Sequence, residues 1–283
     1  MFDWPIGLST GCYHDTNLME CLPTVREAGF SMVEICTSPS HLDYHDIEAT
    51  GAAARRLREL DMEAYSLHAP FSDQIDITSL DDGVRDRSRH DLMQAAEAAA
   101  RLAVRYVVLH PGPESGESDP ARREARRHRA VEVLNQVADR CRELGIALAL
   151  ENMLPHLFSG PARDLLWILG AMAEAGVGVC LDTGHAHLAG DLPSVVDKLS
   201  GHLWLIHAND NRGEGDDHLP PGEGTIDWQR LIERLSRAPF AGGVILEVAG
   251  RDDKQSVLAG ARRGRLYLRD LSRRLALDAL RRP

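Results

Sequence analysis

Residues 202–238 read HLWLIHANDNRGEGDDHLPPGEGTIDWQRLIERLSRA. They show the order of apolar run, polar loop and helical pattern that recurs along the chain. The apolar run at 202–207 predicts a buried strand, and the spacing of apolar residues over 228–238 predicts an amphipathic helix. Gly and Pro residues mark the segment between them as a loop, although it is rich in imidazoles and carboxylates. Such a loop could be merely solvated, so its role depends on what the other units bring near it.

The same order of apolar run, polar loop and helical pattern recurs along the whole chain. Strands are predicted near 5–10, 31–36, 62–68, 105–110, 146–151, 177–182, 202–207 and 243–248. Helical patterns follow at 18–29, 49–60, 89–103, 121–145, 162–176, 193–201, 228–238 and 254–280. Glycines 29, 145 and 176 stand where a helix would end.

Eight strands alternating with eight helices predict an α/β protein, a single (β/α)8 TIM barrel domain over residues 1–283. A barrel of this kind occupies about 250 residues, which suits a chain of this length. The alternative is a doubly wound sheet, which favours a glycine-rich phosphate turn after the first strand. Residues 9–17 read STGCYHDTN at that place, so the barrel is preferred.

Composition limits the classes of protein that this chain can represent. The hydrophobic content is 43% and no apolar run approaches the ~18 residues of a membrane span. The amino-terminal residues lack the basic and apolar regions of a signal peptide, so a cytoplasmic location is expected. A net charge of −11 disfavours broad contact with nucleic acid or anionic membranes.

Cysteine and lysine usage excludes further kinds of chemistry. The cysteines are scattered and odd in number, which argues against a disulfide framework and a thiolate zinc site; they are Cys12, Cys21, Cys36, Cys141 and Cys180. A Schiff-base aldolase needs a lysine on a barrel strand. The two lysines lie elsewhere, because Lys198 falls in a helical pattern and Lys254 falls beyond the last strand.

Metal-binding residue types lie at or near the ends of six successive predicted strands. They are His68, His110, Glu151, Asp182 and His207, with Glu247 inside the eighth strand. In a barrel these ends form one rim, and His185, Asp216 and His218 follow close behind in the loops. Buried carboxylates and imidazoles are costly without a partner, and a bound cation offsets that cost. The mixture predicts a divalent metal, with zinc or manganese favoured and magnesium, cobalt or iron left open.

The motifs around these residues resemble the xylose-isomerase-like barrel superfamily over nearly the whole chain. They are SLHAPF (66–71), VVLHPG (107–112), LEN (150–152), LDTGHAHL (181–188), IHANDN (206–211), DDHLPPGEGTIDW (216–228) and LEV (246–248). That superfamily contains sugar and sugar-phosphate isomerases and epimerases, and also the type IV apurinic endonucleases. The resemblance therefore implies the same barrel and two alternative activities.

Each branch of the superfamily implies its own set of site residues. In the isomerase and epimerase branch, one metal would be held by Glu151, Asp182, His207 and Glu247. His68, His110, His185 and, by a looser alignment, Arg212 would then contact the substrate. In the endonuclease branch, His68, His110 and Glu151 would hold one zinc, and His185, Asp216 and His218 another. The sequence fits both sets.

Four further residues are weaker candidates. Glu34 could line the site or form an ion pair, Asn152 and Asn209 could support metal ligands, and His187 could support its loop.

Two reactions suit these residues. Isomerisation or epimerisation of a sugar requires proton transfer next to a carbonyl through an ene-diolate, and Glu151 and Glu247 could carry that proton. Phosphodiester hydrolysis requires a hydroxide activated by several metal ions. No lysine-rich or aromatic groove suggests a duplex, so a small sugar or sugar phosphate is the expected partner and nucleic acid is the alternative. Assembly into a homo-oligomer stays open.

Overall fold

The barrel predicted from the sequence is confirmed. The computed structural model describes residues 4–173, 176–249 and 254–281. All strands pair in parallel and in chain order, and β8 pairs with β1 to close the sheet. The strands are β1 (Ile6–Ser9), β2 (Met32–Cys36), β3 (Glu63–His68), β4 (Tyr106–Leu109), β5 (Ala147–Glu151), β6 (Val177–Asp182), β7 (Leu203–Ala208) and β8 (Gly243–Leu246).

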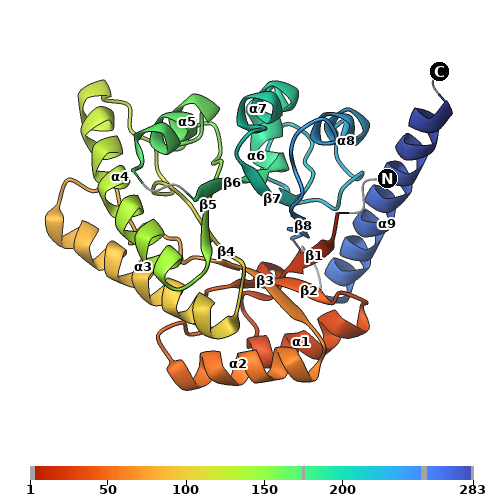
Figure 1. The fold of residues 1–283 in the computed structure, drawn as a ribbon, viewed down its shortest axis with the longest axis horizontal. Helices are drawn as coiled ribbons and strands as arrows, with labels where there is room; N and C mark the ends of the chain where they lie inside the picture. Colours follow the sequence, from red (N-terminus) through yellow and green to blue (C-terminus); the bar gives the residue numbers. More distant parts are fainter. Residues whose placement is uncertain (1–3, 174–175, 250–253, 282–283) are drawn as a thin grey trace.

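The helices surround the strands (Figure 1), and α9 contacts β8. They are α1 (Leu18–Glu27), α2 (Ile47–Glu59), α3 (Asp82–Leu102), α4 (Pro120–Glu143), α5 (Ala162–Ala171), α6 (Thr183–Leu188), α7 (Leu192–Leu199), α8 (Trp228–Leu235) and α9 (Lys254–Arg281). A short 3₁₀ helix, η1 (Thr10–Tyr13), follows β1. Over residues 4–173, 176–249 and 254–281, no helix is both long and apolar enough to cross a membrane.

Two predicted helix boundaries were wrong by several residues. Helix α3 begins at Asp82 instead of residue 89, because the side chain of Asp81 accepts a hydrogen bond from the Val84 N–H and starts the helix earlier. Helix α5 ends at Ala171, where Met172 adopts an extended backbone, so Gly176 does not end it. The predictions for Gly29 and Gly145 are confirmed, since both follow a helix with φ of +86° and +75°.

Side chains on the strands alternate between the helices and the barrel interior. The interior layer contains one buried side chain from each of seven strands: Met32, Tyr65, Val108, Ala149, Cys180, Leu205 and Ile245. Their chain neighbours, such as Val107 and Val179, belong to the larger core between the sheet and the helices. Because the alternation has a period of two, the face on which a strand begins fixes the direction of its last side chain.

Two irregularities break this alternation. Between β2 and β3 the pairing passes from Ala64 to Ser66, so Tyr65 is an extra residue. Between β6 and β7 it passes from Leu203 to Leu205, so Trp204 is the extra residue there. After each bulge the later residues of the strand change face, and His68 of β3 and His207 of β7 turn toward the barrel interior.

The bulge in β7 depends on Gly178 of β6. A Cβ atom at Gly178 would overlap the indole ring of Trp204. We expect Gly178→Ala to lower the free energy of unfolding by about 1–3 kcal/mol, because the indole must leave a packed position. Gly170→Ala is the matched control, since a Cβ there meets nothing within 4 Å. Urea unfolding of both variants tests this; equal stabilities would contradict it.

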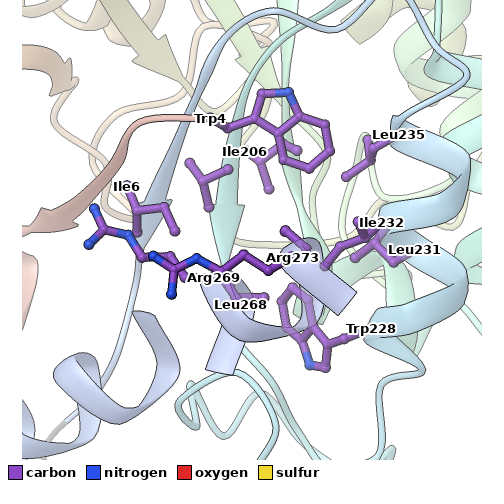
Figure 2. A pocket seen from close by; sticks show the side chains of 12 residues that line it. Trp4, Ile6, Ile206, Trp228, Leu231, Ile232, Leu235, Leu268, Arg269 and Arg273 are labelled. Carbon is purple, nitrogen blue, oxygen red and sulfur yellow. The ribbon is translucent and has the colours of Figure 1, made fainter. Parts of the chain in front are cut away.

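A cavity of about 240 Å³ lies in the outer layer, between the sheet and helices α8 and α9 (Figure 2). Its wall is mainly apolar and includes Trp4, Ile206 and Trp228, and Arg269 and Arg273 reach across it from α9. None of the metal-binding candidates lines it. The cavity is therefore separate from the site at the carboxyl ends of the strands.

Candidate metal centre

The candidate residues at the strand ends meet at one rim. His68, Glu151 and Asp182 are the last residues of β3, β5 and β6, and His207 is the penultimate residue of β7. His110 and Glu247 come directly after β4 and β8, so the prediction that Glu247 lies inside its strand was wrong by one position. The Glu247 N–H still donates to the Ala208 carbonyl at 3.2 Å, which continues the ladder between β7 and β8.

Glu151, Asp182, His207 and Glu247 form the first cluster, which we call the four-residue cluster. Each offers a ligand atom, and these atoms lie within 4.8 Å of one another. His207 Nδ1 lies 3.3 Å from Glu151 Oε2 and 3.3 Å from Glu247 Oε2. This nitrogen is buried and makes no hydrogen bond with any described residue. When its other nitrogen holds the ring proton, its lone pair faces two carboxylates, an arrangement that a cation between them stabilises. The residues therefore fit a divalent metal.

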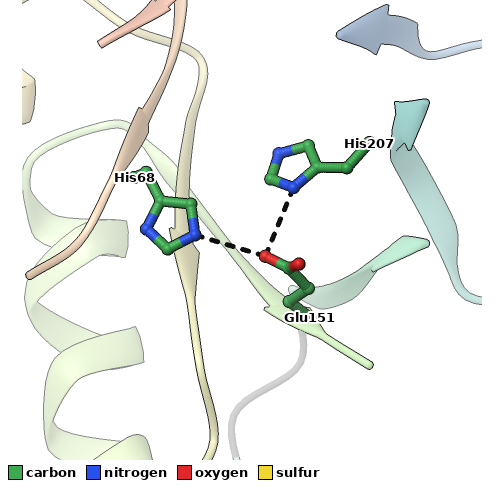
Figure 3. Close-up of side chains that lie close together, drawn as sticks. All are labelled: His68, Glu151 and His207. Atoms are coloured by element: carbon green, nitrogen blue, oxygen red, sulfur yellow. Dashed lines mark hydrogen bonds and ion pairs between the residues drawn. The ribbon is translucent and has the colours of Figure 1, made fainter. Parts of the chain in front are cut away.

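Glu151 is shared with a second cluster that also contains His68 and His207. Figure 3 shows both imidazole rings directed toward one carboxylate oxygen of Glu151, with Nε2 of His68 at 3.3 Å. Nε2 of His110 lies 3.5 Å from the same oxygen. This arrangement brings together the residues that the endonuclease branch would use for one zinc.

His185, Asp216 and His218 form a third cluster. Nε2 of His185 lies 3.4 Å from Asp216 Oδ2, and Nε2 of His218 lies 3.0 Å from the same oxygen. Nδ1 of His185 is 2.9 Å from the Asn152 carbonyl oxygen, to which it can donate, so Nε2 is free to bind a cation. The loop that carries Asp216 and His218 therefore folds over the rim.

Asp210 holds that loop in place, a role that the sequence did not reveal. Its buried carboxylate accepts hydrogen bonds from Gly222 N at 3.0 Å, Ile226 N at 3.1 Å and the Trp228 indole N–H at 2.8 Å. Its backbone also pairs with Leu219 in an isolated antiparallel bridge, next to His218 with φ of +47°. One carboxylate thus folds a Gly- and Pro-rich segment into a defined shape.

We expect Asp210→Ala to lower the free energy of unfolding by about 3 kcal/mol, because each buried donor left unpaired costs about 1–3 kcal/mol. The loop should also exchange its amide hydrogens faster, since its anchor is gone. Glu223→Gln is the control from the same loop, because it removes only an exposed ion pair with Arg263. Hydrogen exchange and thermal unfolding test this; a protected loop in the Ala variant would contradict it.

Two asparagines support Asp182. The side-chain oxygen of Asn152 accepts from the Asp182 N–H at 2.8 Å, and its amide donates to the Asp182 carbonyl at 3.0 Å. Asn209 Nδ2 donates to Asp182 Oδ2 at 2.6 Å. These contacts agree with the predicted supporting role for both asparagines. They leave the aspartate little freedom to rotate, which would favour metal binding.

The titration behaviour of the rim follows from burial opposed by close contacts. Burial raises the pKa of Asp182 to about 6, although His185 lowers it in part. For Glu247 burial would also raise the pKa, but the charge of His207 outweighs the effect of burial and the pKa falls to about 2.

The histidines of the rim shift in the opposite direction. Burial would lower the pKa of His110 and His218, yet hydrogen bonds to Glu114 and Asp216 raise both pKa values to about 9. In the absence of a metal, imidazolium charges therefore balance the carboxylates.

A cavity of about 350 Å³ opens above the clusters. Its polar floor includes Glu151, His185 and Glu247, and its apolar wall includes Phe71 and Leu157. The other apolar lining residues are Met153, Leu154, Val248 and Ala249. Such a mixture of one polar end and an apolar wall is typical of sites for small molecules.

The sequence interpretation missed Glu114, whereas Arg212 and His187 were among its candidates. Glu114 lines the cavity and contacts His110 Nδ1 at 2.8 Å, but it lies in a loop and no strand end marked it. Arg212 is 57% exposed, 3.8 Å from Asp217, and is not among the residues that line the cavity, so a substrate contact for it stays a prediction. His187 contacts Thr225 Oγ1 at 2.9 Å, which agrees with a support for its loop.

Comparisons with known proteins agree with the barrel fold. Residues 22–271 match the model of the family described as xylose isomerase-like TIM barrel. A probable endonuclease 4 of Mycobacterium leprae is 31% identical over 201 residues, which cover 66% of this chain and 74% of that protein. A crystal structure described as a D-tagatose 3-epimerase-like protein is 24% identical, with a TM-score of 0.85 and coverage of 97% and 99% of the two chains. The IOLI protein, solved with a zinc atom, is 19% identical, with a TM-score of 0.80 and coverage of 93% and 97%. The chain therefore belongs to the xylose isomerase-like TIM barrel family.

Proposed function

We propose that this protein is a metal-dependent isomerase or epimerase of a small sugar or sugar phosphate. One observation carries the proposal: the carboxylates of Glu151 and Glu247 both lie 3.3 Å from Nδ1 of His207, at the floor of a cavity of about 350 Å³. Two carboxylates that converge on one small-molecule cavity suit the transfer of a proton to and from carbon. The similarity of the fold to solved structures of sugar epimerases supports a sugar as the substrate.

Glu151, Asp182, His207 and Glu247 would hold the metal, with zinc or manganese as the preferred ion. A divalent ion there would supply a positive charge that stabilises the ene-diolate oxygens of the substrate. His185 and His110, which line the same cavity, would bind substrate hydroxyl groups and orient the reacting carbon.

The two carboxylates differ in access. The side chain of Glu247 is 15% exposed, whereas that of Glu151 is 2% exposed and lies among several imidazoles. We assign to Glu247 the removal of the proton from the carbon next to the carbonyl, whose bonding electrons form the ene-diolate double bond. Glu151 takes a proton from solvent water and delivers it to the opposite face of that carbon, while Glu247 releases its proton to solvent, and the two residues exchange roles in the reverse reaction.

Hydrolysis of a phosphodiester is the second candidate function. It is favoured by the third cluster of His185, Asp216 and His218, which could hold a further metal ion, and by the similarity to a probable endonuclease 4. The net charge of −11 and the half-apolar cavity favour a small sugar over a duplex, because nucleic-acid binding depends on many cationic contacts to phosphates.

Isotope exchange separates the two functions. Protein loaded with manganese or zinc is incubated in heavy water with a panel of free and phosphorylated ketoses, and a duplex with one abasic site is offered in parallel. The proposal expects deuterium at the carbon next to the carbonyl of at least one ketose and an uncut duplex at physiological salt. Cleavage well above background without exchange in any ketose would establish the second function instead.

A further inference from the structure

Glu34 is a buried carboxylate inside the barrel, directly below the four-residue cluster. Its exposed fraction is 0%, and Oε2 lies 2.9 Å from Nε2 of His207. The hydroxyl of Ser66 donates to the same oxygen at 2.8 Å, and the hydroxyl of Ser9 donates to Oε1 at 3.2 Å. No Lys or Arg of the described part of the chain forms an ion pair with it.

The fold builds this environment from three neighbouring strands. Ser9 of β1 and Ser66 of β3 are the register partners of Glu34 in β2. Ser66 faces the interior because the extra residue Tyr65 changes the alternation of β3. A buried carboxylate without a Lys or Arg partner is costly, so hydroxyl donors and an imidazole N–H are its means of stabilisation. Both oxygens of Glu34 are therefore surrounded by hydrogen-bond donors.

We infer that Glu34 is a positioning residue, which fixes the tautomer of His207 and thereby its affinity for a divalent metal. The inference rests on the proposed metal binding by the four-residue cluster. A carboxylate accepts only, so it requires a proton on Nε2 of His207, and Nδ1 then keeps its lone pair toward Glu151 and Glu247. The negative charge behind the ring also makes Nδ1 a better electron donor.

Glu34→Gln tests this with little change in shape. Its amide can turn either group toward His207: the oxygen would keep the hydrogen bond without the charge, and the NH₂ group would drive the ring proton onto Nδ1. Both outcomes weaken metal binding, and we expect the dissociation constant for zinc or manganese to rise by about 10- to 100-fold. Competition with a chelator measures the constant, and thermal unfolding of the metal-free variant shows that the fold persists.

Asp164→Asn is the matched control. Asp164 is also a buried carboxylate, but it contacts Arg123 and Arg127 in the helical layer instead of the cluster. This variant should lower the melting temperature and leave the metal dissociation constant unchanged. Ser66→Ala supplies a second variant if Glu34→Gln does not fold, because it removes one donor to the same oxygen; it should weaken the metal in the same direction by a smaller factor.

The possible results separate this inference from the proposed function. If the wild type binds metal and both Glu34→Gln and Ser66→Ala bind it within twofold of the wild type, Glu34 does not position His207 and the inference is overturned. A weakened variant in a protein that exchanges no sugar proton would support the inference and contradict the proposed sugar chemistry. A wild type that binds no divalent metal would overturn both.

Discussion

Glu247→Gln and Glu151→Gln should each lower the rate of solvent-deuterium exchange into a ketose by about 10²- to 10⁴-fold. Gln keeps the shape of the side chain but cannot accept or return a proton, and a lost general base typically costs this factor. Both residues line the cavity, so both can reach a bound substrate. The loss should appear in kcat, since the proton is carried only during the chemical step.

The same residues belong to the four-residue cluster, so metal content must be measured beside activity. An amide oxygen can still bind a cation, and a variant that retains stoichiometric metal but loses exchange identifies a proton carrier. Asp182→Asn is the comparison, because it changes a candidate ligand that carries no proton in the proposal. Glu223→Gln, an exposed residue paired with Arg263, should exchange at the wild-type rate. Exchange within tenfold of wild type for both Gln variants at Glu151 and Glu247 would contradict the assignment.

Removal of the metal should lower the melting temperature by about 10 °C. A ligand that binds only the folded state stabilises it by mass action, by about 4 kcal/mol when its concentration is a thousandfold above its dissociation constant. For a protein of this size, each kcal/mol shifts the midpoint by roughly 2–4 °C. Without the ion, the carboxylates of Glu151 and Glu247 that face His207 Nδ1 lose the cation that would offset their charge.

Thermal unfolding before and after treatment with a chelator measures this shift, and added zinc or manganese should restore it. His207→Ala should unfold at a temperature that neither chelator nor metal changes, because it lacks the central nitrogen of the cluster. An equal response in the variant and the wild type would place the stabilising ion elsewhere. Absence of stoichiometric metal in wild-type protein under any supplementation would reject the metal centre itself.

Much of the architecture followed from local patterns in the sequence. The apolar runs that became β5 and β6 are bounded by polar loops, and each ends in a carboxylate that lies at the rim. Helix α6 was missed because it is only six residues long, and the side chain of Asp182 starts it by accepting a hydrogen bond from the His185 N–H. A period of 3.6 residues has little signal over so short a segment.

Residues that act through distant contacts could not be predicted in this way. Glu114 lies in the loop after β4, and its contact with His110 depends on how that loop turns. Asp210 holds the loop after β7 by accepting hydrogen bonds from donors at three later positions. The spacing of residues around Asp210 does not predict these contacts. A hydrogen bond of this kind depends on the path of the chain between its two partners. The path of a loop cannot be predicted from residue spacing, because a loop has no periodic pattern.

The sequence by itself determined the fold class, because alternating apolar runs and amphipathic segments require a layered α/β fold. It also showed which residue types stand at the ends of the strands. Only the tertiary structure decided which way the critical side chains point. Strict alternation from Tyr65 in β3 and Trp204 in β7 would have turned Ser66 and His68, and likewise His207, toward the helices. The bulges at these two residues reverse that direction, because a shift of one residue moves every later side chain to the other face. Such a shift is set by pairing with the preceding strands β2 and β6, from which β3 and β7 are separated by one or two helices. It also depends on the space that Gly178 leaves for an indole ring.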